Sequence, residues 1–498
     1  DVQFQWADTE FRAGNFNHAR TRFLQVVDRW PRHAQADQGL LFATEAALLE
    51  VEAASDSTSR PKTLARARSL VDRFEKDYPD SKLAWRHKLQ AGRLEAANGN
   101  PTGFRKAIVL FQEVLAGNPS AQTHRRTRYQ LGRTAGQLED HELVLASLAP
   151  LLTAIRKANG PRDFDDAFVL DATSQLARKQ YAHAVRDASD YLSRRPDGPL
   201  AGRALMLRAE AEEYRKQPDK ADQDLARLAK QTTGPPLYPQ TLQRLAERAY
   251  EGKHYVRSGE LFARLVTLGK TSAFHAAGLS GLAWSLFEQR QYGPAAKSFS
   301  RVVSEHPGSE LAGESAYKAA ESLEKQGDTA KAISGYLQAG RSQGTSRYAF
   351  LSTRRAARLL AGQQKTSEAD LAFSELLKKF PAAERRDQLL FEWAGLHADA
   401  GNFKRADEIY RVLLREAPQS DLVDNARFSL AESDLVAGKS TEAAGAFALL
   451  ATDEKADKTV QQDSLYRLIG IAAGAGQWQD VRQQSESSFW NTPVLQHA

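Results

Sequence analysis

The feature that most constrains this chain is a register of small residues that recurs every 37 residues. Alanine occupies nine successive positions of this register, from Ala135 to Ala431. A second series of small residues follows twelve positions later, from Ala184 to Ala443. A bulky series, from Leu225 to Phe447, follows four positions after that. Such a long period predicts that the chain repeats one supersecondary unit along its length.

Glycine and proline divide each repeat into two helices. A glycine turn separates the two small positions, as at Gly327 and Gly401, and a proline follows the second small position by twelve residues, as at Pro307 and Pro418. Glycine adopts the left-handed conformation that closes a helix, and proline marks where a helix has ended. The sequence therefore predicts an all-α fold of about thirteen helical hairpins with essentially no strand. Neighbouring hairpins must stack, because one pair of helices cannot bury both of its faces.

This pattern strongly resembles the tetratricopeptide repeat family along the whole chain. That family pairs a small residue on the first helix with alanine on the second, then an aromatic residue four positions later and proline twelve positions later, as here. The resemblance implies a right-handed α–α superhelix, a TPR solenoid. The chain departs from the family in its period of 37 instead of 34. It also carries Phe168, Leu205, Leu242 and Leu279 at the usual tryptophan position.

The joins between repeats point to a subtype of that family. Segments such as Pro79–Ala84 and Pro307–Ala312 have the form Pro-x-Ser-x-x-Ala. This join resembles the repeats of bacterial cell-envelope proteins, such as the lipoprotein of the outer-membrane assembly machine and the periplasmic coordinators of cell division. The chain has no cysteine, which fits an oxidising compartment without requiring one. We therefore expect a location in the periplasm or cell envelope, with the cytoplasm as the alternative.

Spacing and charge divide the chain into two parts. Residues 1–133 contain irregular repeats, with spacings of 48, 40 and 40, and carry 21 basic and 15 acidic residues. Residues 134–498 contain the regular 37-residue repeats, with a possible bend near 234–239. The basic first part suggests binding to nucleic acid or an anionic membrane. Interspersed acidic residues make nucleic acid an unlikely partner, and we expect membrane contact only indirectly or through a removed anchor.

The sequence contains fragments of enzymatic motifs, but none of these motifs is complete. Gly438–Ser440 imitates the end of a phosphate-binding loop, but Ser433 replaces the required earlier glycine. Ser315–Lys318 has the Ser-x-x-Lys spacing of acylating enzymes without their companion motifs. The eleven histidines include no pair three or four residues apart, so no helix presents two imidazoles to a metal on one face. We therefore predict no enzymatic activity, no cofactor and no metal site.

The resemblance also implies which residues face the concave groove, namely those 18, 15, 11, 8 and 7 positions before the small residue of the second helix. Acidic and aromatic residues alternate at these positions, whereas the lysine and asparagine of the family's carboxylate clamp are missing. The alternative interpretation is that each glutamate is simply exposed to solvent and that each aromatic residue belongs to the core. The candidate partner-binding residues are Glu247, Glu251, Trp284, Phe287, Tyr317, Glu321, Glu324, Arg354, Arg358, Phe391 and Phe428.

Three functions are compatible with this sequence. The first is a non-catalytic scaffold that binds a peptide or helix of a protein partner, possibly a basic one, in the groove. The second is a regulatory or interaction region of a larger protein whose catalytic or transport domain lies outside this chain. The third is binding of nucleic acid or anionic membrane through the basic first quarter, which predicts affinity that falls steeply with salt.

Overall fold

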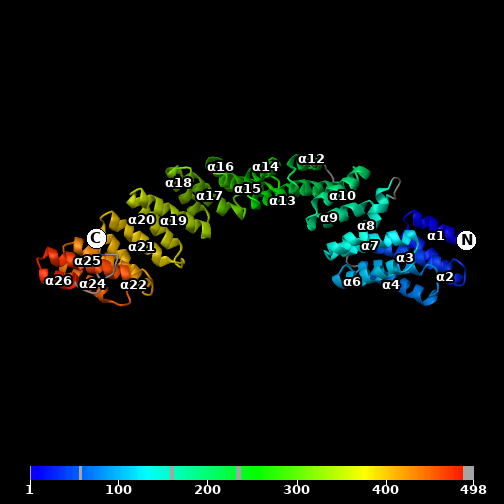
Figure 1. The fold of residues 1–498 in the computed structure, drawn as a ribbon, viewed down its shortest axis with the longest axis horizontal. Coiled ribbons are helices and arrows are strands. Elements are labelled where there is room, and N and C mark those ends of the chain that lie inside the picture. The colour runs from blue at the N-terminus through cyan, green and yellow to red at the C-terminus, as the bar shows by residue number, and fades with distance from the viewer. Residues whose placement is uncertain (1, 55–58, 158–161, 231–236, 486–498) are drawn as a thin grey trace. The chain divides into compact units, whose positions relative to one another are not determined.

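The computed structural model describes residues 2–54, 59–157, 162–230 and 237–485. Every regular element in these residues is a helix, and the twenty-six helices form the thirteen predicted hairpins, called repeats 1 to 13 (Figure 1). Odd-numbered helices are the first helices of the repeats and even-numbered helices are the second helices. The fold is an α–α solenoid, as predicted. None of the described helices is both long enough and apolar enough to span a membrane.

The chain folds as two compact units, Asp1–Leu245 and Ala246–Ala498, and the division falls within α13. The N-terminal unit contains α1 (Val2–Arg12), α2 (Phe16–Arg29), α3 (Ala36–Ala53), α4 (Arg60–Asp77), α5 (Ala84–Ala96), α6 (Pro101–Ala116), α7 (Ala121–Gln137), α8 (His141–Arg156), α9 (Asp166–Ala177), α10 (Tyr181–Arg194), α11 (Ala201–Tyr214) and α12 (Pro218–Leu228). The predicted change in regularity near residue 133 falls inside this unit. Residues 231–236 lie outside the described part, so the bend expected at 234–239 stays a prediction.

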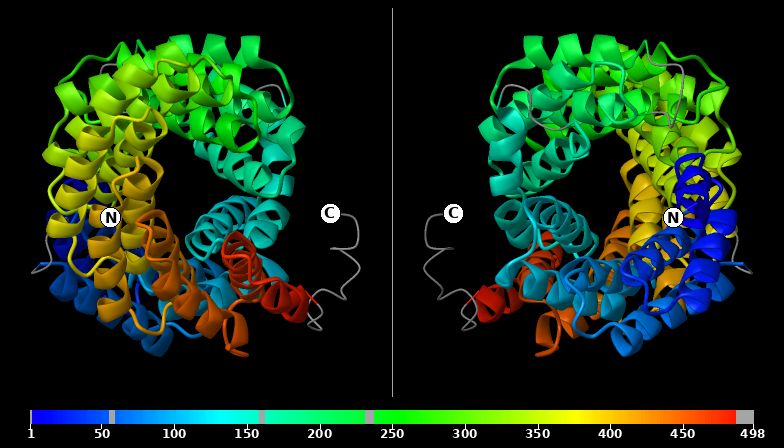
Figure 2. Two further views of the ribbon diagram at one scale, coloured as in Figure 1. Left: turned by 90° about the vertical axis from the view of Figure 1, so that its left-hand side faces the viewer. Right: turned by 90° about the vertical axis from the view of Figure 1, so that its right-hand side faces the viewer.

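The C-terminal unit begins within α13 (Leu237–Glu251). It continues with α14 (Tyr255–Val266), α15 (His275–Glu288), α16 (Tyr292–Glu305), α17 (Leu311–Lys325), α18 (Thr329–Ser342), α19 (Arg347–Gly362), α20 (Thr366–Lys379), α21 (Arg386–Asp399), α22 (Phe403–Glu416), α23 (Val423–Val436), α24 (Ser440–Thr452), α25 (Lys458–Gly474) and α26 (Trp478–Ser485). Figure 2 shows these hairpins from two sides, with consecutive pairs of helices stacked against one another.

The periodic residues form the core that the sequence predicts. All nine alanines from Ala135 to Ala431 are buried, and so are the eight small residues from Ala184 to Ala443. The bulky series from Leu225 to Phe447 is buried as well. Small residues let the two helices of a hairpin approach closely, and the aromatic ring one turn further on fills the space toward the next hairpin. The 37-residue register is therefore a packing register.

The turn between the two helices is left-handed whether or not it contains glycine. Gly327 and Gly401 have φ of 91° and 73°, as expected for glycine. In the same register, Lys253, Arg290 and Gln364 have φ of 61°, 60° and 58°. The glycine pattern in the sequence thus identifies only some of the left-handed turns. The Gly438–Ser440 segment is one of them, since Gly438 has φ of 76° and α24 begins at Ser440.

Contacts between helices identify the concave face of each unit. First helices contact the first helix of the next repeat, as α15 does with α17 and α17 with α19. Among the described helices, no two successive second helices come together to the same extent. Closer spacing on one side curves the stack toward that side. The first helices therefore line the concave face in each unit.

Candidate functional site

All eleven candidate residues lie on first helices of the C-terminal unit. Glu247 and Glu251 are on α13, Trp284 and Phe287 on α15, Tyr317, Glu321 and Glu324 on α17, Arg354 and Arg358 on α19, Phe391 on α21, and Phe428 on α23. Within this set, the residues of repeats 9 and 10 lie around one cavity. Glu247, Glu251 and Phe428 do not line that cavity.

Five candidate residues from α17 and α19 line one cavity of about 260 Å³, which we call the groove cavity. Its full lining comprises Tyr317, Glu321, Glu324, Lys325, Tyr336, Leu351, Arg354, Arg355 and Arg358. Tyr336 belongs to the buried bulky series of the second helices, so the cavity reaches down to the hairpin core. A concave site with an apolar base and convergent charged groups suits the recognition of a ligand side chain.

Glu324 is held by two groups of the cavity. Arg355 donates through both Nε, at 3.0 Å, and Nη2, and the Tyr336 hydroxyl donates at 2.9 Å. Burial alone raises the pKa of Glu324, but the hydrogen bonds from Arg355 and Tyr336 outweigh it, so its pKa is lowered. The carboxylate is therefore ionised at neutral pH and connects α17 to α19, the first helices of successive repeats.

Glu392 plays the corresponding part between α19 and α21. It accepts hydrogen bonds from Arg354 Nη2 at 2.8 Å and from Arg358 Nε at 2.9 Å. Burial raises the pKa of Glu392, and the two arginines lower it further than burial raises it. Both candidate arginines thus already have a carboxylate partner from the next repeat.

The aromatic residues of repeat 8 hold a lysine of the chain itself. Lys318 Nζ lies 4.6 Å from the centroid of the Trp284 ring and 5.1 Å from that of Phe287. The same ammonium group is 2.7 Å from a carboxylate oxygen of Glu321. Cation–π attraction and an ion pair act on one group here. Trp284, Phe287 and Glu321, which the sequence suggested for a basic group of a partner, therefore already bind Lys318 of the chain itself.

Three other candidate aromatics also pack against the hairpin core. Tyr317, Phe391 and Phe428 each contact the ring of the bulky residue 19 positions later, at centroid distances of 5.5, 5.5 and 5.3 Å. Each of the three is half-buried. Phe391 and Arg358 also line a second, larger cavity of about 900 Å³ between repeats 10 and 11. Tyr317 and Phe391 therefore contact the core and also line a cavity.

A sequence model of the tetratricopeptide repeat family matches residues 4–42 and 280–346. The second match includes the last nine residues of α15, all of α16 to α18, and five of the nine residues that line the groove cavity. Over these two segments the chain is similar to tetratricopeptide repeats. This family match also agrees with a scaffold more than with an enzyme, since the repeat typically serves binding. No curated protein matches the sequence significantly.

Three solved structures are similar to this chain at low identity and low TM-score. One is a tetratricopeptide repeat protein from Parabacteroides merdae, with 15% identity over 55% of this chain and 98% of that one, at a TM-score of 0.33. Another is the C-terminal part of a TPR repeat-containing protein from Cytophaga hutchinsonii, with 12% identity over 53% and 99%, at 0.35. The third is the APC/C hetero-tetramer Cut9–Hcn1, with 14% identity over 99% and 94%, at 0.30. Likenesses this distant identify no partner.

Sequence reasoning missed one position of the tetratricopeptide groove. Lys318, Arg355 and Glu392 lie 37 residues apart, 14 positions before the small residue of each second helix. Each makes contacts with the preceding repeat, to Trp284, Glu324 and Arg358 respectively. A signal was present in the sequence, because each residue stands 31 to 34 positions after a partner of matching chemistry. Reading charges across repeats, and not within one helix, would have found it.

Proposed function

We propose that this chain is a non-catalytic scaffold that binds a segment of a protein partner on the concave face of repeats 8 to 11. The observation that carries the proposal is the groove cavity, where first helices of successive repeats place tyrosine, glutamate and arginine around one concavity. Ser315, from the Ser-x-x-Lys motif, is buried within α17, so it has no access to a substrate.

The charge of this surface supports an acidic segment as the partner. The cavity lining carries four basic and two acidic side chains, and the neighbouring Lys318 and Glu392 add one of each sign. Two of the glutamates from which the sequence suggested a basic partner, Glu321 and Glu324, are already paired with Lys318 and Arg355. An incoming carboxylate gains attraction from the net positive charge and competes for the arginine donors. A basic segment has to displace the chain's own cations.

A displayed library of random peptides tests both the site and the sign of its charge. We expect the full chain to enrich peptides that combine acidic and aromatic residues. Their affinity should fall about tenfold or more in Arg358→Gln, which removes an exposed donor of the cavity. Arg341→Gln removes an exposed arginine from the second helix α18 and serves as the matched control. Enrichment of basic peptides, or equal binding by both variants, would contradict the proposal.

The location and the context of the scaffold belong to the same proposal. We place it in a bacterial cell envelope on the strength of the Pro-x-Ser joins and the lack of cysteine, with the cytoplasm as the alternative. Fractionation of source cells with an antibody against the chain tests this placement. The mass of the intact protein in the same fractions tests the alternative that the repeats are an interaction region of a larger protein.

A second candidate function rests on a cavity of about 220 Å³ in the N-terminal unit, which we call the N-terminal cavity. Arg86 and Arg126 line it, and neither forms an ion pair within the described part of the chain. Burial, and then the charge of Arg126, lower the pKa of Arg86. Two guanidinium groups that repel one another favour an anionic ligand, such as a phosphate of nucleic acid or lipid. Binding to heparin or anionic vesicles should then fall steeply with salt.

A further inference from the structure

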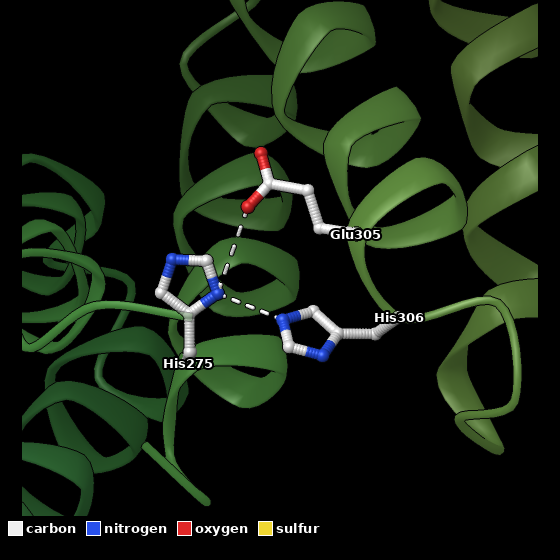
Figure 3. Close-up of side chains that lie close together, drawn as sticks. All are labelled: His275, Glu305 and His306. Atoms are coloured by element: carbon white, nitrogen blue, oxygen red, sulfur yellow. Dashed lines mark hydrogen bonds and ion pairs between the residues drawn. The ribbon is translucent and has the colours of Figure 1, made fainter. Parts of the chain in front are cut away.

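Two histidines and a glutamate from the two helices of repeat 8 meet at one end of the hairpin. His275 is the first residue of α15, Glu305 is the last residue of α16, and His306 is the residue that follows it. Figure 3 shows the two rings and the carboxylate turned toward one another. One potential ligand atom from each residue lies within 4.8 Å of the other two. The sequence search for histidine pairs within one helix could not find residues 30 and 31 positions apart.

The distances are close to those of a metal site. His275 Nδ1 lies 2.8 Å from His306 Nε2 and 3.9 Å from Glu305 Oε2. Around a tetrahedral zinc ion with bonds of about 2.1 Å, ligand atoms stand about 3.3 Å apart. These two distances from His275 therefore need to change by only about half an ångström each, and the third, between Glu305 and His306, is at most 4.8 Å. His275 is buried, so the site is enclosed on that side.

The protons of the two rings are compatible with metal binding. The contact between His275 Nδ1 and His306 Nε2 requires a proton on one of the two nitrogens. Each neutral imidazole has a second nitrogen, and that proton moves to it when the ring changes tautomer. Metal binding would thus replace one hydrogen bond by two metal–nitrogen bonds without adding a charge to either ring.

The surrounding charges leave one oxygen of the glutamate available. Arg301 Nε donates to Oε1 of Glu305 at 2.8 Å, whereas Oε2 faces His275 and accepts only a long hydrogen bond of 3.5 Å from Arg301 Nη2. Lys270 Nζ lies 3.6 Å from Oε2, but its side chain is 68% exposed and can turn into solvent. The site also lies at the C-terminus of α16, where the partial negative charge of the helix favours a cation.

We propose that His275, Glu305 and His306 bind one divalent transition-metal ion, with zinc as the best match and water in the remaining position. Two imidazole nitrogens and one carboxylate oxygen suit zinc better than magnesium or calcium, which prefer all-oxygen sites. The ion would cross-link the start of α15 to the end of α16. It would thereby stiffen the hairpin whose first helix carries Trp284 and Phe287.

Calorimetric titration of the untagged, metal-free full chain with zinc chloride tests the site. We expect one saturable zinc ion per chain at this site and a rise in melting temperature on binding. In His306→Gln the affinity should fall at least tenfold. His183→Gln removes an exposed histidine of α10 and should bind as the wild type does. Absence of saturable binding in the wild type, or unchanged binding in His306→Gln, would overturn the proposal.

A second variant keeps the test decisive if His306→Gln disturbs the fold. Lys270→Gln removes the exposed cation beside Glu305 and leaves all three proposed ligands in place. It should bind zinc several-fold more tightly, and Co²⁺ should show the intense visible absorption of a tetrahedral site with nitrogen ligands. Zinc binding that is as tight in Glu305→Gln as in the wild type would exclude Glu305 as a ligand. A weak, octahedral cobalt spectrum would contradict the proposed tetrahedral site.

Discussion

The groove cavity of the C-terminal unit and the N-terminal cavity are both lined by arginines from first helices. The two cavities differ in how many of these arginines have a carboxylate partner. In the groove cavity, Arg354, Arg355 and Arg358 all have a carboxylate partner from a neighbouring repeat. In the N-terminal cavity only Arg93 is paired, with Glu45 and Glu52. Arg86 and Arg126 share that cavity without a carboxylate of their own among the described residues.

The difference teaches that one scaffold supports two uses of the same residue type. Ion pairs between successive first helices fix the spacing of the repeats, so the arginines of the groove cavity contribute to structure as well as to recognition. Arginines without partners weaken the fold slightly and raise the affinity for anions. Whether an arginine is paired depends on the side chains of the neighbouring repeats and not on the backbone.

The contrast extends to carboxyl groups. In the N-terminal unit Asp171 and Asp187 are both buried, and Asp187 Oδ2 has no hydrogen-bond partner among the described residues. Burial, followed by the hydrogen bond to Asp187, raises the pKa of Asp171 to about 7. A proton shared between the two side chains satisfies the remaining oxygen. In the C-terminal unit, Glu324 and Glu392 instead have lowered pKa values because arginines hold them.

The largest expected effect is an opposite dependence of the two regions on pH. Between its unfolded value near 3.8 and its folded value of about 7, Asp171 binds a proton only in the folded state. The N-terminal unit should therefore lose about 1.4 kcal/mol of unfolding free energy per pH unit as the pH rises through this window. The ion pairs of Glu324 and Glu392 are present above their unfolded value of 4.5 and are lost as the pH falls. Hydrogen exchange along a pH series measures both regions at once.

Asp171→Asn supplies the control for that pH series. Its amide can donate to Asp187 at every pH, so the pH dependence of α9 and α10 should flatten, while that of α17 to α21 stays unchanged. A slope that persists in this variant would place the titrating group elsewhere.

Removing one arginine from each cavity should give different losses of stability. Arg355→Gln leaves Glu324, whose side chain is 17% exposed, without its cationic partner and with only the Tyr336 hydroxyl as a donor. After allowance for the exposure of Arg355 itself, we expect a loss of about 1 kcal/mol, seen as faster hydrogen exchange in α17 and α19. Arg126→Gln should leave stability unchanged or raise it by up to about 0.5 kcal/mol, while it weakens binding to heparin. Equal losses in the two variants would remove the distinction between the cavities.

The smallest expected effect concerns the left-handed turns, which differ along the chain in residue type. Arg290→Gly relieves a left-handed arginine in repeat 8 and should stabilise it by about 0.5–1 kcal/mol. Gly327→Ala should destabilise repeat 9 by a similar amount, although a Cβ there would meet no atom within 4 Å. Denaturant titrations of both variants compare the turns. Effects of the same sign would show that factors other than backbone conformation dominate.

The periodic sequence predicts the fold well, because burial and helix termination are local and recur in each repeat. Ala283 and Phe299 are buried as their register requires. The site is less predictable, since a groove residue acts through partners from the next repeat. Glu324 looks like a free acid in the sequence, yet Arg355, 31 residues later, holds it. The sequence likewise does not show that His275 and His306 meet, because the path of the chain between them decides it.

The central claim is that the partner segment lies on the concave face of repeats 8 to 11. Hydrogen exchange of the full chain, with and without the most strongly enriched library peptide, tests it directly. We predict slower exchange in α17, α19 and α21, and little change in α18, α20 and α22, which contribute only Tyr336 to the lining of the groove cavity. Protection confined to the second helices, or to the N-terminal unit, would contradict the account.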